Sequence, residues 1–174
     1  CHVSTKGSVD YIRRMKAAGI HVTAETCPQY FTLTEEEIEK QGAMAKVNPP
    51  LRTRADVEAI LEGLEDGTLD CIITDHAPHT VEEKARELPK APSGMVGLET
   101  SLALSLTVLH HQLGWPLMKV LRAMSTAPAG ILQLDAGSLR VGAPADIVLF
   151  DPEETWTVRP EAFASKGRNT PFAG

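Results

Sequence analysis

The most constraining feature of this sequence is an amphipathic helix that leads directly into a short apolar strand. The apolar residues of the helix recur at i, i+3, i+4 and i+7, at Val57, Ile60, Leu61 and Leu64. Thr53 precedes them as a candidate N-cap, and Gly67 turns the chain into the run LDCIIT at 69–74. A short apolar run that follows a helix and is flanked by turn residues is typical of a parallel strand covered on both faces.

Strands and helices alternate along the first two-thirds of the chain. Residues 8–18 predict a helix, and HVTAE at 21–25 alternates as a short strand. Thr34 and Glu37 have the spacing of a capping box ahead of a short acidic helix. This order predicts an α/β fold with a parallel sheet. Because a complete (β/α)8 barrel takes about 250 residues, the sheet is either open or part of a barrel.

The second half of the chain changes character twice. After a polar loop at 75–97, the pattern predicts a long apolar helix at 98–113, a second helix near Pro116 and a short third helix around Pro128. From Gly137 the sequence has turn glycines and β-branched residues without a helical period, which predicts hairpin strands of a different sheet. We therefore place a domain boundary near residue 135, which gives units of 1–135 and 136–174.

Composition excludes several classes of protein. The net charge is −6 and lysines and arginines do not cluster, which argues against a nucleic-acid partner. No apolar run approaches the roughly 20 residues that cross a bilayer. Cys1, Cys27 and Cys71 suit neither a disulfide framework nor a C-x-x-C zinc site, and favour reduced, buried thiols in a cytoplasmic protein. The opening CHVSTKGS has neither an initiator Met nor a signal sequence, which favours a natural start further upstream.

Metal-competent side chains follow the apolar run at 69–74. Asp75, His76 and His79 occur in the segment TDHAPH, at what would be the C-terminal end of a buried strand. Proteins of the α/β class build their sites at this edge of the sheet. A carboxylate there can bind a metal and carry a proton. The alternative interpretation is an N-cap aspartate followed by two surface histidines.

Two further polar residues are candidates with weaker local signals. His2 would follow a preceding strand, although a lone histidine can equally be a structural residue. Asn48 lies in KVNPPLR at 46–52, where two prolines fix an extended or turn geometry and leave an amide that can donate and accept hydrogen bonds. An Asx-type turn is the alternative explanation for Asn48.

These fragments together resemble the dihydroorotases of the bacterial type I class, in the amidohydrolase superfamily. The matching strings occur in the family's order and cover essentially the whole chain: CHVSTKGS, AKVNPPLRTRAD, DGTLDCIITDHAPH, EEK, GMVGLETSLAL, GSLRVGAPADIVLFDPEETWTV and SKGRNTPFAG. The resemblance implies the C-terminal part of a metal-dependent hydrolase (β/α)8 barrel, about strands six to eight, within 1–135. It also implies that 136–174 form part of a small β-sandwich made from both ends of the complete chain.

The same resemblance implies a zinc site. His2 matches the family's strand-six ligand and Asp75 its strand-eight aspartate, and a complete site holds one or two zinc ions. Asp75 would bind zinc, take a proton from the attacking hydroxide and pass it to the leaving amide nitrogen. The other ligands would precede Cys1. Since catalytic zinc ordinarily has three protein ligands and water, this polypeptide alone is predicted to be inactive and poorly folded.

The substrate side of the site follows from the resemblance as well. Asn48 and His79 match positions that hold the substrate, with His79 near its carboxylate. Ser93 and Gly94 match the loop whose backbone contacts the pyrimidine ring, although the family commonly has Phe or Asn at the place of Ser93. The implied reaction is the reversible cyclisation of N-carbamoyl-L-aspartate to (S)-dihydroorotate in pyrimidine biosynthesis. The implied partners are this small-molecule substrate, and a second copy of the chain or aspartate transcarbamoylase.

Two other functions remain open. The segment ETCPQYF at 25–31 is closer to hydantoinases and allantoinases, whereas KVNPPLR and DHAPH oppose that assignment. The other alternative is a non-catalytic dihydroorotase-like partner of aspartate transcarbamoylase. Such proteins tend to lose zinc ligands, but His2 and Asp75 are both present here.

Overall fold

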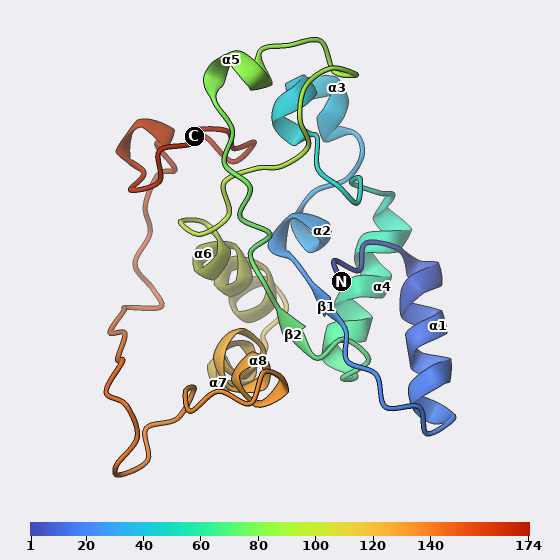
Figure 1. Ribbon diagram of the computed structural model, residues 1–174, viewed down its shortest axis with the longest axis vertical. Coiled ribbons are helices and arrows are strands. Elements are labelled where there is room, and N and C mark those ends of the chain that lie inside the picture. The colour runs from blue at the N-terminus through green and yellow to red at the C-terminus, as the bar shows by residue number, and fades with distance from the viewer.

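A small parallel sheet lies at the centre of the molecule in the computed structural model, which describes residues 1–174 (Figure 1). Strand β1 (Glu25–Thr26) pairs with β2 (Cys71–Ile72) in the register Glu25↔Cys71. On the far side of β1 the N-terminal segment lies alongside, because Val3 N donates to Glu25 O at 2.9 Å. The two predicted strands are confirmed in kind and direction, but the first lies at 25–26 and residues 21–24 are not in a strand.

The helices α1 (Lys6–Ala17) and α4 (Arg54–Glu65) pack against each other beside the sheet (Figure 1). The predicted N-cap of α4 is confirmed, since Thr53 Oγ1 donates to Asp56 Oδ2 at 2.6 Å and Thr53 N donates to the same oxygen at 3.2 Å. Three of the four residues in the predicted apolar stripe are buried, and the fourth is partly buried: Val57, Ile60, Leu64 and Leu61. The periodicity of the sequence therefore identified the buried face of this helix.

The close contact between α4 and its neighbours depends on Gly63. A Cβ atom at this position would lie 2.9 Å from Val9 Cγ1 and 3.2 Å from Leu69 Cγ, and both side chains are buried. We expect Gly63→Ala to destabilise the complete protein by about 1–3 kcal/mol through overpacking. At Gly130, in the helix α8 (Ala127–Ile131), no atom lies within 4 Å of a Cβ. Gly130→Ala should therefore stabilise by roughly 0.5–1 kcal/mol.

Denaturant unfolding of both variants checks this pair of expectations. A Gly63→Ala variant that is as stable as Gly130→Ala would contradict the close packing of α4 against Val9 of α1 and against Leu69, which precedes β2.

Four short helical segments connect these elements. They are α2 (Pro28–Thr32), α3 (Glu37–Gln41), a 3-10 helix (Gly42–Ala45) and α5 (Val81–Lys84). The acidic helix at α3 was predicted, but its capping box was wrong. The side chain of Thr34 is buried and its backbone oxygen, not its hydroxyl, accepts from Glu37 N at 3.0 Å. The Glu37 carboxylate turns instead to Lys40 and Gln41 within the helix.

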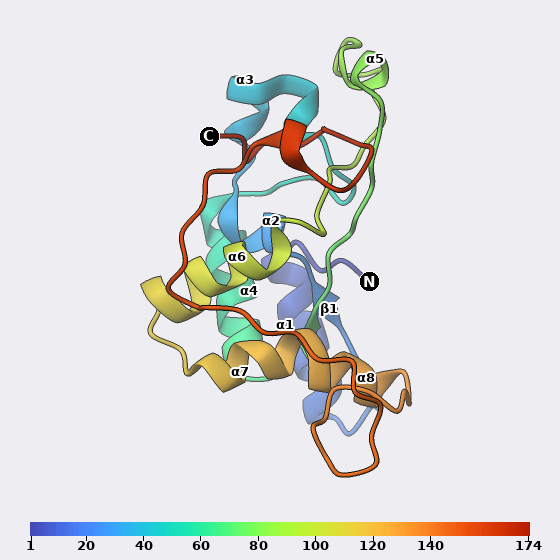
Figure 2. The same cartoon turned by 90° about the vertical axis from the view of Figure 1, so that its left-hand side faces the viewer.

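Longer helical stretches cover the other side of the strands (Figures 1 and 2). Helix α6 (Ser101–Ser105) continues as a π-helix (Leu106–Gln112), which confirms the apolar helix predicted at 98–113 with a later start. A second stretch comprises α7 (Leu117–Leu121), a π-helical segment (Arg122–Thr126) and α8. Fully buried large side chains in the core come from both sides of the sheet, and they include Val9, Ile60, Leu69, Leu109 and Val120. No helix has the combination of length and apolarity that a membrane span needs.

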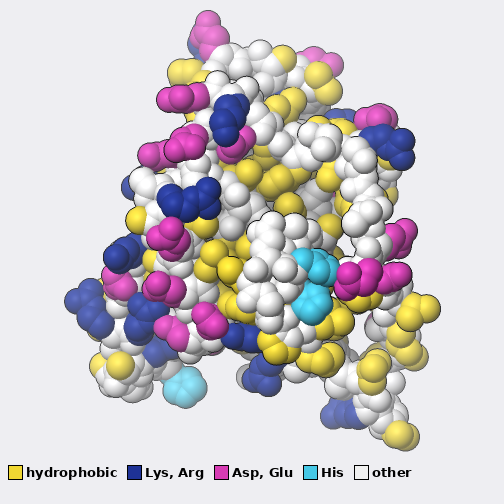
Figure 3. Space-filling view, turned by 180° about the vertical axis from the view of Figure 1, so that it is seen from behind, with side chains coloured by type: hydrophobic (Ala, Val, Ile, Leu, Met, Phe, Trp, Pro, Cys, Tyr) yellow, Lys and Arg dark blue, Asp and Glu magenta, His cyan; other side chains and the backbone are white.

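The hairpin predicted after Gly137 is wrong for this structure. Residues 137–159 contain no strand and run along the edge of the molecule (Figure 1). Their apolar side chains are open to solvent, with Leu139 85% and Leu149 97% exposed, and Figure 3 shows such side chains on this part of the surface. The physical reason is that an extended segment becomes a strand only when neighbouring backbone pairs with it, and no segment of this chain does so.

The last residues return to the α/β part. A 3-10 helix (Pro160–Ala162) precedes a stretch in which Phe163, Asn169 and Thr170 are buried. Val96 N donates to Asn169 O at 2.8 Å, so the end of the chain contacts the segment that follows β2.

Among the cysteines, Cys27 and Cys71 are buried and free as predicted, whereas Cys1 is exposed.

Candidate active site

The structure places the side chains of His2 and Asp75 next to each other. His2 Nε2 lies 3.9 Å from Asp75 Oδ1. The two residues come from segments on either side of β1, one just before Val3 and the other just after β2. Both have positive φ angles, 53° for His2 and 45° for Asp75. Non-glycine residues rarely adopt this conformation, and such local strain concentrates at functional sites.

Glu25 holds His2 in its orientation. Both carboxylate oxygens of Glu25 accept from the backbone N–H of His2 at 2.8 Å, and Oε1 lies 3.2 Å from His2 Nδ1. A carboxylate at one imidazole nitrogen fixes the ring and directs the other nitrogen toward a bound group. In His2 that other nitrogen faces Asp75. Glu25 was not among the predicted site residues, although its place at the end of a predicted strand could have indicated a role.

Asp75 has a protein partner on its other oxygen. Gln29 Nε2 donates to Asp75 Oδ2 at 3.2 Å, although Gln29 was not among the predicted site residues. Burial raises the pKa of Asp75 above its usual value, the neighbouring His2 opposes this shift, and the charge of Glu25 adds to it. A carboxylate whose pKa is raised toward neutrality is a better proton acceptor.

The His2–Asp75 pair provides part of a zinc site. An imidazole nitrogen and a carboxylate oxygen are ordinary zinc ligands, and two ligand atoms on one tetrahedral zinc lie roughly 3.3 Å apart. The observed separation of 3.9 Å is slightly wider than this. Cys27 Sγ lies 3.9 Å from His2 Nδ1, and His2, Glu25 and Cys27 offer ligand atoms within 4.8 Å of one another. Burial raises the pKa of this thiol far above its usual value. Two residues are too few for catalytic zinc, so the donor set fits the metal but is incomplete.

Three of the predicted substrate residues, His79, Ser93 and Gly94, form a second cluster, the His79 cluster. His79 Nε2 lies 3.0 Å from Ser93 O. Gly94 has a φ of 133°, and a Cβ there would lie 3.2 Å from His79 Nε2. The loops that carry these residues are joined by the parallel bridge between His76 and Met95. His79, Ser93 and Gly94 are thus brought together, and no hydrogen bond joins them to His2 or Asp75.

The segment around Asn48 lies beside this cluster, but its side chain does not join it. Lys46 O accepts from Gly94 N at 2.8 Å, and Pro49 O accepts from the hydroxyl of Tyr30 at 2.8 Å. The Asn48 side chain is exposed and makes no hydrogen bond, so the Asx turn considered as its alternative is not formed. Its amide remains open for a ligand.

The alternative interpretation of TDHAPH as a helix N-cap is wrong. The helix that follows is α5, and its N-cap is Thr80, whose hydroxyl accepts from Glu83 N at 3.2 Å. His76 has a structural role, because its Nδ1 accepts from the backbone N–H groups of Gly97 and Leu98.

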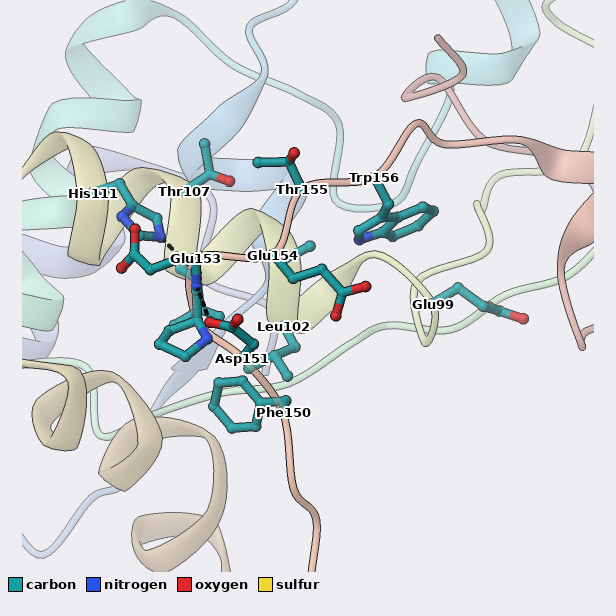
Figure 4. A pocket seen from close by; sticks show the side chains of 13 residues that line it. Glu99, Leu102, Thr107, His111, Phe150, Asp151, Glu153, Glu154, Thr155 and Trp156 are labelled. Carbon is teal, nitrogen blue, oxygen red and sulfur yellow. Dashed lines mark hydrogen bonds between the residues drawn. The ribbon is translucent and has the colours of Figure 1, made fainter.

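A separate cavity of about 440 Å³ lies between α6, its π-helical continuation and residues 150–156 (Figure 4). His111 Nε2 lies 3.0 Å from Pro152 O, which attaches the C-terminal segment to the helix. His110, His111 and Glu153 offer ligand atoms within 4.8 Å of one another. None of the site residues predicted from the sequence lines this cavity.

Comparison with known proteins identifies the family. The sequence profile of the amidohydrolase family matches residues 2–173. The chain belongs to the amidohydrolase family. Its match covers both the His2–Asp75 pair and the His79 cluster, and confirms the coarse prediction of an α/β amidohydrolase fold.

Curated relatives in this family are named dihydroorotase. The chain is 52% identical over 173 residues to a dihydroorotase from Clostridioides difficile (strain 630), a match that covers 99% of this chain and 41% of that protein. It is 51% identical over 174 residues to a dihydroorotase from Geobacillus thermodenitrificans (strain NG80-2), with 100% and 41% covered. The chain therefore spans about two-fifths of the length of the curated amidohydrolases it matches.

Solved amidohydrolase structures match the fold over the same extent. An L-hydantoinase (dihydropyrimidinase) from Arthrobacter aurescens superposes with a TM-score of 0.93 at 32% identity, and covers 99% of this chain and 40% of its own. A dihydropyrimidinase from Brevibacillus agri NCHU1002 gives a TM-score of 0.89 at 30% identity, with 99% and 40% covered.

Proposed function

We propose that the complete protein to which this chain belongs is a zinc-dependent dihydroorotase. It would catalyse the reversible cyclisation of N-carbamoyl-L-aspartate to (S)-dihydroorotate in pyrimidine biosynthesis. The observation that carries the proposal is the 52% identity to a dihydroorotase over 99% of the chain. The separation of 3.9 Å between His2 and Asp75 supports it, because the two residues that match zinc ligands lie within reach of one metal ion.

His2 and Asp75 would hold the metal in this proposal. A bound zinc ion would supply Lewis acidity at the amide carbonyl. Asp75 would accept a proton from the attacking water and deliver it to the leaving amide nitrogen, which suits a partly buried carboxylate with a raised pKa. Glu25 and Gln29 would keep the imidazole and the carboxylate aligned for this transfer.

The substrate would lie between the metal and the His79 cluster. His79 would bind near its carboxylate, Asn48 would use its free amide, and the backbone at Ser93 and Gly94 would contact the ring. The side chain of Ser93 is not needed for such a contact, since it is the Ser93 carbonyl that lies 3.0 Å from His79 Nε2.

We further propose that residues 1–135 form about strands six to eight of a (β/α)8 barrel and that 136–174 belong to a composite β-sandwich. The exposed apolar side chains of Leu139, Val141 and Leu149 support the second part, since strands from elsewhere in the complete protein would cover them. A cytoplasmic location, and a second copy of the chain or aspartate transcarbamoylase as partner, remain predictions from the sequence.

A hydantoinase-type cyclic amidohydrolase is the second candidate. Two observations favour it: the segment ETCPQYF at 25–31 and the TM-score of 0.93 to an L-hydantoinase. Gln29 of this segment contacts Asp75, so the segment is part of the site.

Turnover of the complete, zinc-loaded protein on dihydroorotate, hydantoin and allantoin separates these functions. We expect kcat/KM for dihydroorotate to exceed that for either other ring by roughly 100-fold or more, because a site built for a carboxylate rejects substrates that lack it. Preference for hydantoin or allantoin would replace the proposed function. No turnover of any ring, together with no bound zinc, would favour the non-catalytic partner of aspartate transcarbamoylase.

A further inference from the structure

A buried asparagine near the C-terminus connects the two loops of the His79 cluster. Asn169 is 2% exposed. Its Nδ2 donates to Ala77 O and to Gly94 O, both at 3.1 Å, and its Oδ1 accepts from His79 N at 2.9 Å. Two carbonyls and one N–H fix the orientation of this amide, because only NH₂ can face the carbonyls and only the oxygen can face the N–H.

Lys84 reaches the same carbonyl from the other side. Its side chain is buried, and Nζ donates to Gly94 O at 2.8 Å, to Pro92 O at 3.1 Å and to Lys46 O at 3.4 Å. Lys46 O also accepts from Gly94 N at 2.8 Å. The peptide groups of the 92–94 turn are therefore held by donors from α5 and from the C-terminal stretch, and by the Lys46 carbonyl as an acceptor.

The packing around these contacts leaves little freedom for the turn. A Cβ at Gly94 would lie 2.5 Å from Ala77 Cβ, so the two loops touch through backbone. A Cβ at Gly167 would lie 2.6 Å from Pro78 Cβ, so the C-terminal stretch is pressed equally closely on the His79 loop. The relative position of His79 and Ser93 is thus set by Asn169 and Lys84, neither of which forms a hydrogen bond with His2 or Asp75.

We propose that Asn169 and Lys84 are positioning residues that fix the Ser93–Gly94 turn against His79 and so set the affinity for the substrate. The proposal rests on the proposed function, in which His79 and this turn bind the carboxylate and the ring. It predicts that loss of the network weakens substrate binding while the metal ligands and the chemical step stay intact.

Asn169→Asp and Lys84→Met in the complete, zinc-loaded protein test this inference. The aspartate keeps the shape of asparagine but turns a carboxylate oxygen toward two carbonyl oxygens. The methionine keeps most of the apolar stem of lysine but removes all three donated bonds. For each variant we expect KM for dihydroorotate to rise about tenfold or more and kcat to change less than about threefold. Bound zinc should not change.

Two matched variants serve as controls. Gln133→Glu adds a carboxylate at an exposed position, and Lys90→Met removes an exposed lysine whose side chain pairs only with Glu87. Both should leave KM and kcat as in the wild type.

The possible outcomes separate this inference from the proposed function. If the wild type turns over hydantoin but not dihydroorotate, the proposed function fails. The ratio of each variant's KM to that of the wild type, measured on hydantoin, then decides whether Asn169 and Lys84 position the turn. An unchanged KM in both network variants overturns the inference. Equal losses of kcat and zinc, or failure of both variants to fold, also overturn it, because the network would then stabilise the fold as a whole.

Discussion

Replacement of Asp75 by asparagine in the complete, zinc-loaded protein is expected to lower kcat for dihydroorotate by roughly 10³-fold or more. The amide has nearly the shape of the carboxylate, but it is a poor metal ligand and cannot accept a proton and return it. Because burial already disfavours the charged form of Asp75, the neutral amide should not lower the thermal midpoint of the zinc-free protein. Loss of activity without loss of folding is the expected signature of a residue that acts on the substrate.

Steady-state kinetics, zinc content and thermal melting of the same preparation check this expectation. Asp146→Asn is the matched control, because Asp146 is exposed and takes part in no ion pair of the structure. A fully active Asp75→Asn enzyme would remove Asp75 from the mechanism. A variant that is inactive only because it melts far below the wild type would leave Asp75 with a structural role.

A polypeptide of residues 1–174 by itself is expected to show no turnover of dihydroorotate above background and no stoichiometric zinc. His2 and Asp75 provide two ligands, whereas catalytic zinc ordinarily has three protein ligands and water. The chain also leaves large apolar side chains uncovered, among them Leu139, Val141 and Leu149. Exposed apolar surface of this kind lowers solubility and gives the folded state less burial to offset chain entropy.

Expression of residues 1–174 and of the complete protein under the same conditions, followed by zinc analysis and turnover assays, makes the comparison. The complete protein is the positive control. Zinc bound at one equivalent and robust turnover by residues 1–174 alone would show that the ligand set is complete without further chain. The assignment of His2 and Asp75 as a partial set would then be wrong.

The elements that the sequence predicted correctly are those whose signal is local. Helix α4 combines an apolar stripe with a capping residue, and both features depend on residues close to one another in the chain. The strand at β2 is a short apolar run between turns, and Asp75 follows directly from it. Hydrophobic periodicity, turn residues and caps therefore fixed the α/β class and placed a carboxylate at a strand end.

The errors arose where the structure depends on what lies next to a segment. Residues 137–159 have a strand-like composition, yet without a paired neighbour they form no hairpin. Thr34 has the spacing of a capping residue, but its side chain is buried, and burial decided its role.

The sequence by itself determined which chemical groups are available: an imidazole at 2, a carboxylate at 75 and an amide at 48. Only the tertiary structure decided which of them meet, because their contacts join residues far apart in the chain. His2 meets Glu25 and Asp75, Gln29 meets Asp75, and Asn169 meets Gly94 across 75 positions. Side-chain hydrogen bonds between such distant residues leave no periodic pattern in a sequence, and they appear only once the backbone has brought its strand ends and loops together.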